Sequence, residues 1–195
     1  MERPLKTALI NFVLNTAYSL YYLIFGFTDN SWWLLTLGLY YFILSVVRFV
    51  VLQTKSKERF VLKFAGIMLV MLSIPLVGTV ILSVARDRGK RLHMIVMIAI
   101  AAYAFTKITL ATIKFIKSRH GAMGAIVALR NISFADAFVS IFALQRSMLV
   151  SFEGMSETEI VIMNASLGSA VCVIVFLLGL NLVRNKKALF KTLDD

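Results

Sequence analysis

Asp136 is the residue whose type and position most clearly suggest chemistry in this chain. It is the only acidic residue inside an apolar run, within NISFADAFVSIFALQ at 131–145. A charged side chain in the middle of an apolar helix that lies in lipid costs about 2.5–3.5 kcal/mol or more. Such a carboxylate is therefore normally paired, buried among other helices, or functional, which makes Asp136 the first candidate for a functional residue.

Lys107 is the expected partner of Asp136. It lies near the middle of the preceding apolar run, in YAFTKITLATIKF at 103–115, roughly 14 Å from the basic end of that run. Helices joined by a short connection are usually neighbours, so the two side chains can meet. Arg130 is the alternative partner, but a gap of six residues places it off the helical face of Asp136. We therefore predict an ion pair between Lys107 and Asp136.

Other polar side chains share helical faces with these two residues. Spacings of three and four residues collect polar groups on one face in each of three apolar runs. They either form hydrogen-bonded seams between helices or line a polar pathway. The whole candidate site is Asp136, Lys107, Asn11, Asn15, Tyr18, Tyr103, Ser133 and Ser140.

No familiar catalytic, metal or cofactor motif accompanies this cluster. The single cysteine, Cys172, lies inside the last apolar run, and His93 and His120 are far apart in sequence. Neither a metal-ligand spacing nor a glycine-rich phosphate loop is visible, and no serine nucleophile elbow appears. We therefore expect no catalytic residue, no metal and no cofactor, and we do not expect an enzyme.

Composition places these residues in a membrane protein. The 195-residue chain is 59% hydrophobic and only 16% charged, whereas soluble domains contain about 25% charged residues. The expected fold class is all-α: residues 1–195 form one polytopic transmembrane domain. The net charge of +11 could suggest nucleic acid, but the basic residues cluster in the short connections. No nucleic-acid partner is expected, and the basic inner connections would attract anionic membrane lipids.

Six apolar runs are long enough to cross about 30 Å of hydrocarbon as helices. The fifth has the least certain start, because residues 121–131 are either an interfacial helix or an inner extension of the span. With a start at 132, Asp136 would lie roughly 9 Å from the middle of the span. The predicted spans are about 7–27, 32–53, 60–85, 94–116, 132–152 and 158–183.

Basic residues predict the orientation of these spans. Twelve of those near the ends of the spans fall on one side of the membrane and four on the other. Because Lys and Arg accumulate on the cytoplasmic side, both termini are predicted to be cytoplasmic. The basic connection 86–93 is an exception: it is either outweighed or meets lipid phosphates or a partner. Arg48 and Lys63 lie near the inner ends of their spans, so we expect them to extend to the headgroups.

Two stretches of the chain are alike. Residues 40–59 and 102–121 each have a tyrosine within their first two positions, continue as an apolar body and end in basic residues. A repeat of helical hairpins would explain the likeness. The simpler interpretation, which we favour, is that any span running from outside to inside ends in basic residues.

Three segments resemble a group of small six-helix integral membrane proteins of Gram-positive bacteria. They are WWLLTLGLYY at 32–41, AIAAYAFTK at 99–107 and NISFADAFVSIFALQ at 131–145. The resemblance covers nearly the whole chain and is most recognisable around Asp136. It implies a multi-pass protein of a bacterial plasma membrane and no particular activity.

Three functions compete at this point. The favoured hypothesis is a small transporter or channel subunit in which polar groups of the first, fourth and fifth spans line the path. The second is a non-transporting subunit that assembles with a membrane partner or with its own copies. Small residues at the start of the last span would supply a close-packed face for that assembly. An intramembrane enzyme is the least favoured, because no nucleophile–base pair supports it.

Overall fold

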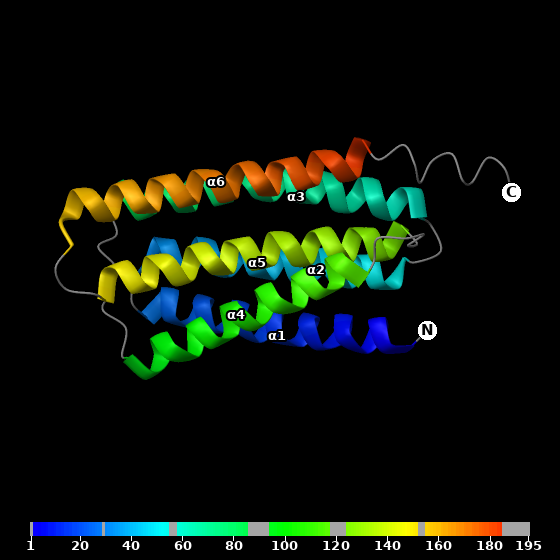
Figure 1. Ribbon diagram of the computed structural model, residues 1–195, viewed down its shortest axis with the longest axis horizontal. Coiled ribbons are helices and arrows are strands. Elements are labelled where there is room, and N and C mark those ends of the chain that lie inside the picture. The colour runs from blue at the N-terminus through cyan, green and yellow to red at the C-terminus, as the bar shows by residue number, and fades with distance from the viewer. Residues whose placement is uncertain are drawn as a thin grey trace, which may run out of the picture.

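The apolar runs fold into helices in the computed structural model of the chain (Figure 1). Six helices form within the described residues, which are 2–28, 30–54, 58–85, 94–117, 124–151 and 155–184; side chains are not described for 2–11, 85, 94–97, 99, 100, 103, 114–117, 150 and 151. The helices are α1 (Glu2–Thr28), α2 (Trp32–Gln53), α3 (Glu58–Ala85), α4 (Met94–Lys117), α5 (Gly124–Ser151) and α6 (Glu157–Arg184).

Short polar segments begin two of these helices. Asn30 adopts a positive φ of 54°, a conformation that asparagine tolerates, and the Ser31 hydroxyl accepts a bond from Leu34 N at 3.5 Å. Ser156 and Glu159 form a reciprocal capping box at the start of α6, because each side chain accepts a bond from the other's backbone N–H. These caps fix where α2 and α6 start.

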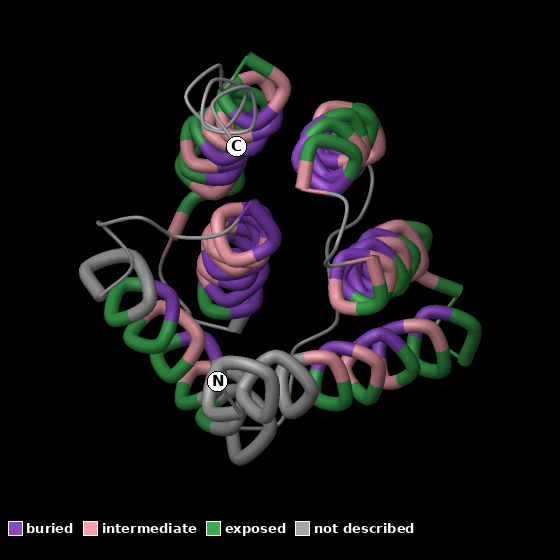
Figure 2. The backbone as a smooth tube through the Cα atoms, turned by 90° about the vertical axis from the view of Figure 1, so that its right-hand side faces the viewer, coloured by how far each residue is buried: buried purple, intermediate pink, exposed green. Residues whose placement is uncertain are grey.

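The helices form two columns of three. In the end view, α1, α2 and α3 follow one another up one column, and α4, α5 and α6 follow one another up the other (Figure 2). Neighbours along the chain pack within each column, and the columns are joined by contacts of α3 with α6, α2 with α5 and α3 with α5. The helices α1 and α4 lie at the edge opposite α3 and α6. The chain therefore builds two three-helix halves that meet along their length.

The two halves are related by inversion of their helix directions. Because each half contains three helices joined by short connections, α1 and α4 run in opposite directions, as do α2 and α5, and α3 and α6 (Figure 1). An inverted repeat would have these directions, as would any six helices that alternate in direction along the chain. The likeness between residues 40–59 and 102–121 falls mainly on α2 and α4, which run in the same direction and would not be equivalent in an inverted repeat.

Four helices are long and apolar enough to cross a membrane, judged on the described residues alone. They are Trp32–Gln53, Glu58–Val84, Gly124–Leu149 and Glu157–Arg184, and α4 contributes a shorter apolar stretch, Ala104–Ile113. An all-helical fold compatible with an integral membrane protein is thus confirmed. The count of six spans and the cytoplasmic location of both ends stay predictions, although α1 begins and α6 ends at the same end of the bundle (Figure 1).

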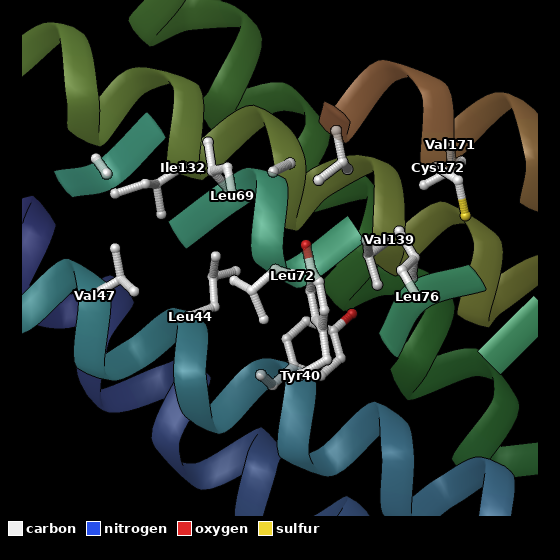
Figure 3. Close-up of a cluster of buried hydrophobic side chains, with 14 of the residues drawn as sticks. Tyr40, Leu44, Val47, Leu69, Leu72, Leu76, Ile132, Val139, Val171 and Cys172 are labelled. Carbon is white, nitrogen blue, oxygen red and sulfur yellow. The ribbon is translucent and has the colours of Figure 1, made fainter. Parts of the chain in front are cut away.

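Apolar side chains both fill the interior and cover the outside. The interior cluster draws mainly on α2, α3, α5 and α6, with Tyr22 added from α1, and Tyr40, Leu72, Val139 and Val171 are among its members (Figure 3). Large apolar residues such as Ile74 on α3, 71% exposed, point outward, and the exposed positions lie on the outer helix faces (Figure 2). An outer surface of this kind suits contact with lipid rather than water.

The start of α5 changes the predicted depth of Asp136. The helix begins at Gly124 rather than near 132, so residues 124–131 belong to the fifth helix as an extension of the predicted span. Asp136 then lies about 2 Å from the middle of α5, counted at about 1.5 Å per residue. The estimate of roughly 9 Å counted from a start at 132, eight residues after the helix begins, and the depth of Asp136 in a membrane stays a prediction.

Glycines let α3 and α6 approach each other closely. A Cβ added at Gly179 would meet the Gly66 carbonyl oxygen at 2.9 Å, and one added at Gly66 would meet the Gly179 carbonyl oxygen at 2.8 Å. Real side chains do not tolerate such approaches to backbone atoms. The contact between the two halves at this point therefore requires both glycines.

We expect Gly179→Ala to destabilise the bundle by about 1–3 kcal/mol, because the new methyl group forces α3 and α6 apart. Gly78→Ala is the matched control, since a Cβ at Gly78 meets nothing within 4 Å. It should be neutral or stabilising by up to about 1 kcal/mol. The measurement is unfolding by sodium dodecyl sulfate in mixed micelles. Equal stability of the two variants would contradict the close α3–α6 contact.

Candidate functional site

Asp136 accepts hydrogen bonds from side chains of three other helices. Lys107 Nζ of α4 donates to Oδ1 at 2.6 Å, and Asn15 Nδ2 of α1 donates to Oδ2 at 2.8 Å. Arg48 Nη2 of α2 donates to the same Oδ2 at 3.4 Å. The first two bonds are short, whereas the third is longer than a good N–H···O bond. Lys107 is therefore the principal ionic partner, and the predicted pair is present.

Arg48 does not extend to the headgroups as expected. Its side chain is 2% exposed and turns inward to Asp136, while Lys63 is exposed. The sequence position of Arg48 suggested an interfacial residue because it lies near the end of its span. An extended arginine side chain spans more than one helical turn of about 5.4 Å, however, and here it reaches the carboxylate of Asp136. The expectation for Arg48 was wrong.

The site lies at half the height of the bundle. Asn15, Lys107 and Asp136 each lie within about 3 Å of the middle of their own helices, counted at about 1.5 Å per residue. Arg48 starts about 8 Å from the middle of α2 and reaches back toward the carboxylate. The ion pairs therefore sit where an embedded bundle is farthest from water.

Serine and tyrosine hydroxyls extend the network along α5. Ser140 Oγ donates to the Asp136 carbonyl oxygen at 2.8 Å, and it lies 3.0 Å from the Tyr41 hydroxyl. Because a serine hydroxyl has only one proton, Tyr41 is the donor to Ser140. Ser133 Oγ donates to the Leu129 carbonyl oxygen and accepts from Arg48 Nη2 at 3.4 Å. The two serines therefore lie one turn before and one turn after Asp136 on the same face of α5, and each connects α5 to α2.

Tyrosine rings form an aromatic wall beside Lys107. Lys107 Nζ lies 4.9 Å from the centre of the Tyr41 ring and 5.8 Å from that of Tyr18. Tyr22 stacks on Tyr41 with ring centres 5.8 Å apart and an interplanar angle of 13°. A buried ammonium gains from both the ring faces and the carboxylate, so the wall helps to hold Lys107 inside the bundle.

Most of the predicted site residues come together. Asn15, Tyr18, Lys107, Ser133, Asp136 and Ser140 all belong to the network described above. The side chains of Asn11 and Tyr103 lie outside the described residues. Sequence analysis missed Arg48 and Tyr41. Tyr41, Ser45 and Arg48 lie four and three residues apart, so they share one face of the second helix. This polar face could have indicated that Tyr41 and Arg48 point into the bundle.

Comparisons with known proteins identify no relative. No family model matches the chain, and neither a curated protein nor a solved structure is significantly similar to it. Among the described side chains, no group of three or more His, Cys, Asp or Glu residues could hold a metal ion.

We expect Asp136→Asn to destabilise the protein by about 3–5 kcal/mol, because it removes the carboxylate charge that two buried cations share. The double variant Lys107→Met/Asp136→Leu should recover only part of this loss, since Arg48 stays buried and charged. Adding Arg48→Met should recover most of it. Unfolding by sodium dodecyl sulfate in mixed micelles measures all three.

Two outcomes would contradict this account of the site. Wild-type stability of Asp136→Asn would show that the carboxylate does not compensate buried charge. Full recovery in the double variant would show that Arg48 is not part of the charged cluster.

Proposed function

We propose that this protein is a small membrane transporter or channel subunit whose two inverted halves act around Asp136. The six helices cross a bacterial plasma membrane with both termini in the cytoplasm, and the basic inner connections contact lipid headgroups. No enzyme activity is part of this proposal. The function rests on the placement of one charged cluster between two halves of inverted topology.

The observation that carries the proposal is the pair of donors on Asp136. Asn15 of the first half and Lys107 of the second donate to different oxygens of the same carboxylate. Each lies thirteen residues after its helix begins, at Glu2 and at Met94. Both donors therefore lie near the middle of the first helix of their half. A relative motion of the two halves would therefore change the hydrogen bonds that Asp136 accepts.

Transporters with inverted repeats bind their cargo near the membrane midplane, where the repeats meet. Charged residues at that depth commonly mark ion and proton pathways. In this protein the Lys107 bond joins α4 to α5, the Asn15 bond joins α1 to α5, and the Arg48 bond joins α2 to α5. A rocking motion of one half against the other would break the Asn15 and Arg48 bonds and leave the Lys107 bond intact.

A non-transporting subunit is the second candidate, and the tight burial of the cluster favours it. Asp136 is 3% exposed and Arg48 is 2% exposed. A sealed ion-pair cluster would fix the register of the helices in a protein that assembles with a membrane partner or with its own copies. The two functions differ in whether water reaches the Asp136 stripe.

Thiol labelling in sealed vesicles tests the proposal. In a Cys172→Ala background, Ser140→Cys should react with a small membrane-impermeant methanethiosulfonate, because a transport pathway must open to the Asp136 stripe. Val139→Cys is the control: it is the neighbouring residue on α5 and is fully buried in the apolar cluster, so it should stay unreactive.

The rate of Ser140→Cys labelling decides between the two candidates. A rate well above that of Val139→Cys, from either side of the membrane, supports transport. If Ser140→Cys is as unreactive as Val139→Cys from both sides, the stripe is sealed, and the transport proposal fails in favour of the subunit.

A further inference from the structure

The Lys107 ammonium occupies a site that three other helices build. Its Nζ lies 2.6 Å from Asp136 Oδ1 of α5, 4.9 Å from the centre of the Tyr41 ring of α2 and 5.8 Å from that of the Tyr18 ring of α1. A carboxylate and aromatic ring faces are the groups that recognise organic ammonium ions. Asp136, Tyr41 and Tyr18 therefore form an ammonium site, because all three surround one nitrogen atom, and Lys107 of α4 fills it.

The carboxylate of the ammonium site has other donors besides Lys107. Asn15 of α1 and Arg48 of α2 both donate to Oδ2, whereas Lys107 donates to Oδ1. In this arrangement of the helices, a different ammonium on Oδ1 would leave both bonds to Oδ2 in place, one of them from a cation. Asp136 can therefore stay charged and oriented while the occupant of Oδ1 changes.

The ring faces of the ammonium site are also held by residues outside α4. The ring centre of Tyr22 lies 5.4 Å from that of Tyr18 and 5.8 Å from that of Tyr41, and Tyr18 and Tyr41 are 6.3 Å apart. The Tyr41 hydroxyl is fixed by its bond to Ser140 of α5. The two rings therefore keep these contacts when a different ammonium takes the place of Lys107.

The two halves of the bundle contribute different parts of the ammonium site. Lys107 and Asp136 belong to the second half, whereas Tyr18 and Tyr41 belong to the first. In the proposed rocking motion the ring faces would move away and water would reach the Lys107–Asp136 pair. The lysine ammonium ends a flexible four-carbon stem, so it can turn into that water when another cation takes Oδ1. Closure would then bring the ring faces onto the new occupant.

We propose that the substrates of this protein are small primary ammonium ions, which bind Asp136 in place of Lys107. The distance from Nζ to Oδ1 is that of a charge-assisted hydrogen bond, which a quaternary ammonium cannot form because it has no N–H. Sodium is disfavoured, because hard cations are bound by sets of oxygen ligands, whereas ring faces make up much of this site. The return of Lys107 to Oδ1 would release the substrate. The inference rests on the proposed function, for which it supplies the substrate class.

Lys107→Ala vacates the ammonium site for a free ion. The variant lacks Cγ, Cδ, Cε and Nζ, which n-propylammonium reproduces. At equal ionic strength, n-propylammonium chloride should raise the Tm of this variant in detergent above its Tm in sodium chloride by on the order of a few degrees. Tetramethylammonium chloride should not. Lys63→Ala is the matched control, because it removes an exposed lysine of α3, and it should show no specific response. Equal Tm values of Lys107→Ala in the three salts overturn the inference.

Two substitutions of Tyr18 in the Lys107→Ala background test the ring faces. Tyr18→Leu removes a ring face, so the apparent Kd of n-propylammonium should rise about threefold to tenfold. Tyr18→Phe keeps the face and should leave this Kd within about twofold. The same Kd in both variants would show that Tyr18 does not recognise the ion, against the inference.

Exchange in the wild-type protein is measured by solid-state NMR in lipid bilayers. The dipolar coupling between Lys107 Nζ and the Asp136 carboxyl carbon should weaken as methylammonium chloride is added. Sodium chloride at equal ionic strength should leave it unchanged. A coupling that keeps its full strength throughout the methylammonium titration overturns the inference. This measurement does not depend on whether Lys107→Ala folds.

The inference and the proposed function can fail separately. Displacement of Lys107 by methylammonium together with an unreactive Ser140→Cys would keep the ammonium site and reject transport. A reactive Ser140→Cys without any response to methylammonium would keep the transport pathway and reject primary ammonium ions as its substrates.

Discussion

The fold depends on satisfying one carboxylate at half the height of the bundle. Asp136 can stay charged there only if donors surround it, and its two oxygens receive them from α1, α2 and α4. Because α4 packs mainly on α5, the Lys107 bond is the polar contact that fixes the rotation of α4. The Asn15 bond does the same for α1, which otherwise packs on α2. Asp136 thus helps to set the rotation of α1 and α4 about their own axes relative to the rest of the bundle.

The two halves of the bundle contribute differently to this constraint. Their contact at α3 and α6 is apolar and close, through Gly66 and Gly179, and it leaves little freedom to slide. Their contact near α1 and α4 is polar and passes through Asp136. A bundle that is tightly joined along one edge and joined by exchangeable hydrogen bonds along the other can pivot about the tight edge. That mechanical asymmetry is the physical basis of the proposed transport function.

Much of this arrangement could be predicted from the sequence. The apolar runs gave the helices, and the height of Lys107 beside Asp136 gave the pair, because a buried charge needs a partner within reach. Asn15 shares a polar face of the first span with other polar residues, which correctly predicted that its side chain faces the interior. These predictions depend on interactions within one helix or between two helices joined by a short connection, which a sequence pattern can indicate.

The remaining features depend on packing between distant segments. Arg48 looked interfacial because its distance from the helix end is a property of one span, whereas its inward turn depends on α5 lying against α2. The start of α5 stayed open because Arg130 and Asn131 interrupt the apolar pattern, whereas Asn131 is buried and its side chain bonds the Val127 carbonyl oxygen. The packing of α3 on α6 and of α2 on α5, which joins the two halves, likewise appears only when the helices are arranged in space.

Solid-state NMR on the protein in lipid bilayers tests the central claim most directly. With 15N-labelled lysine and 13C-labelled aspartate, the dipolar coupling between Lys107 Nζ and the Asp136 carboxyl carbon reports their separation, and Asp136→Asn assigns the signal. The account predicts a separation within about 4 Å, as a direct charge-assisted hydrogen bond requires. The account would be contradicted if wild-type and Asp136→Asn spectra showed the same couplings, because no signal could then be assigned to the Lys107–Asp136 pair.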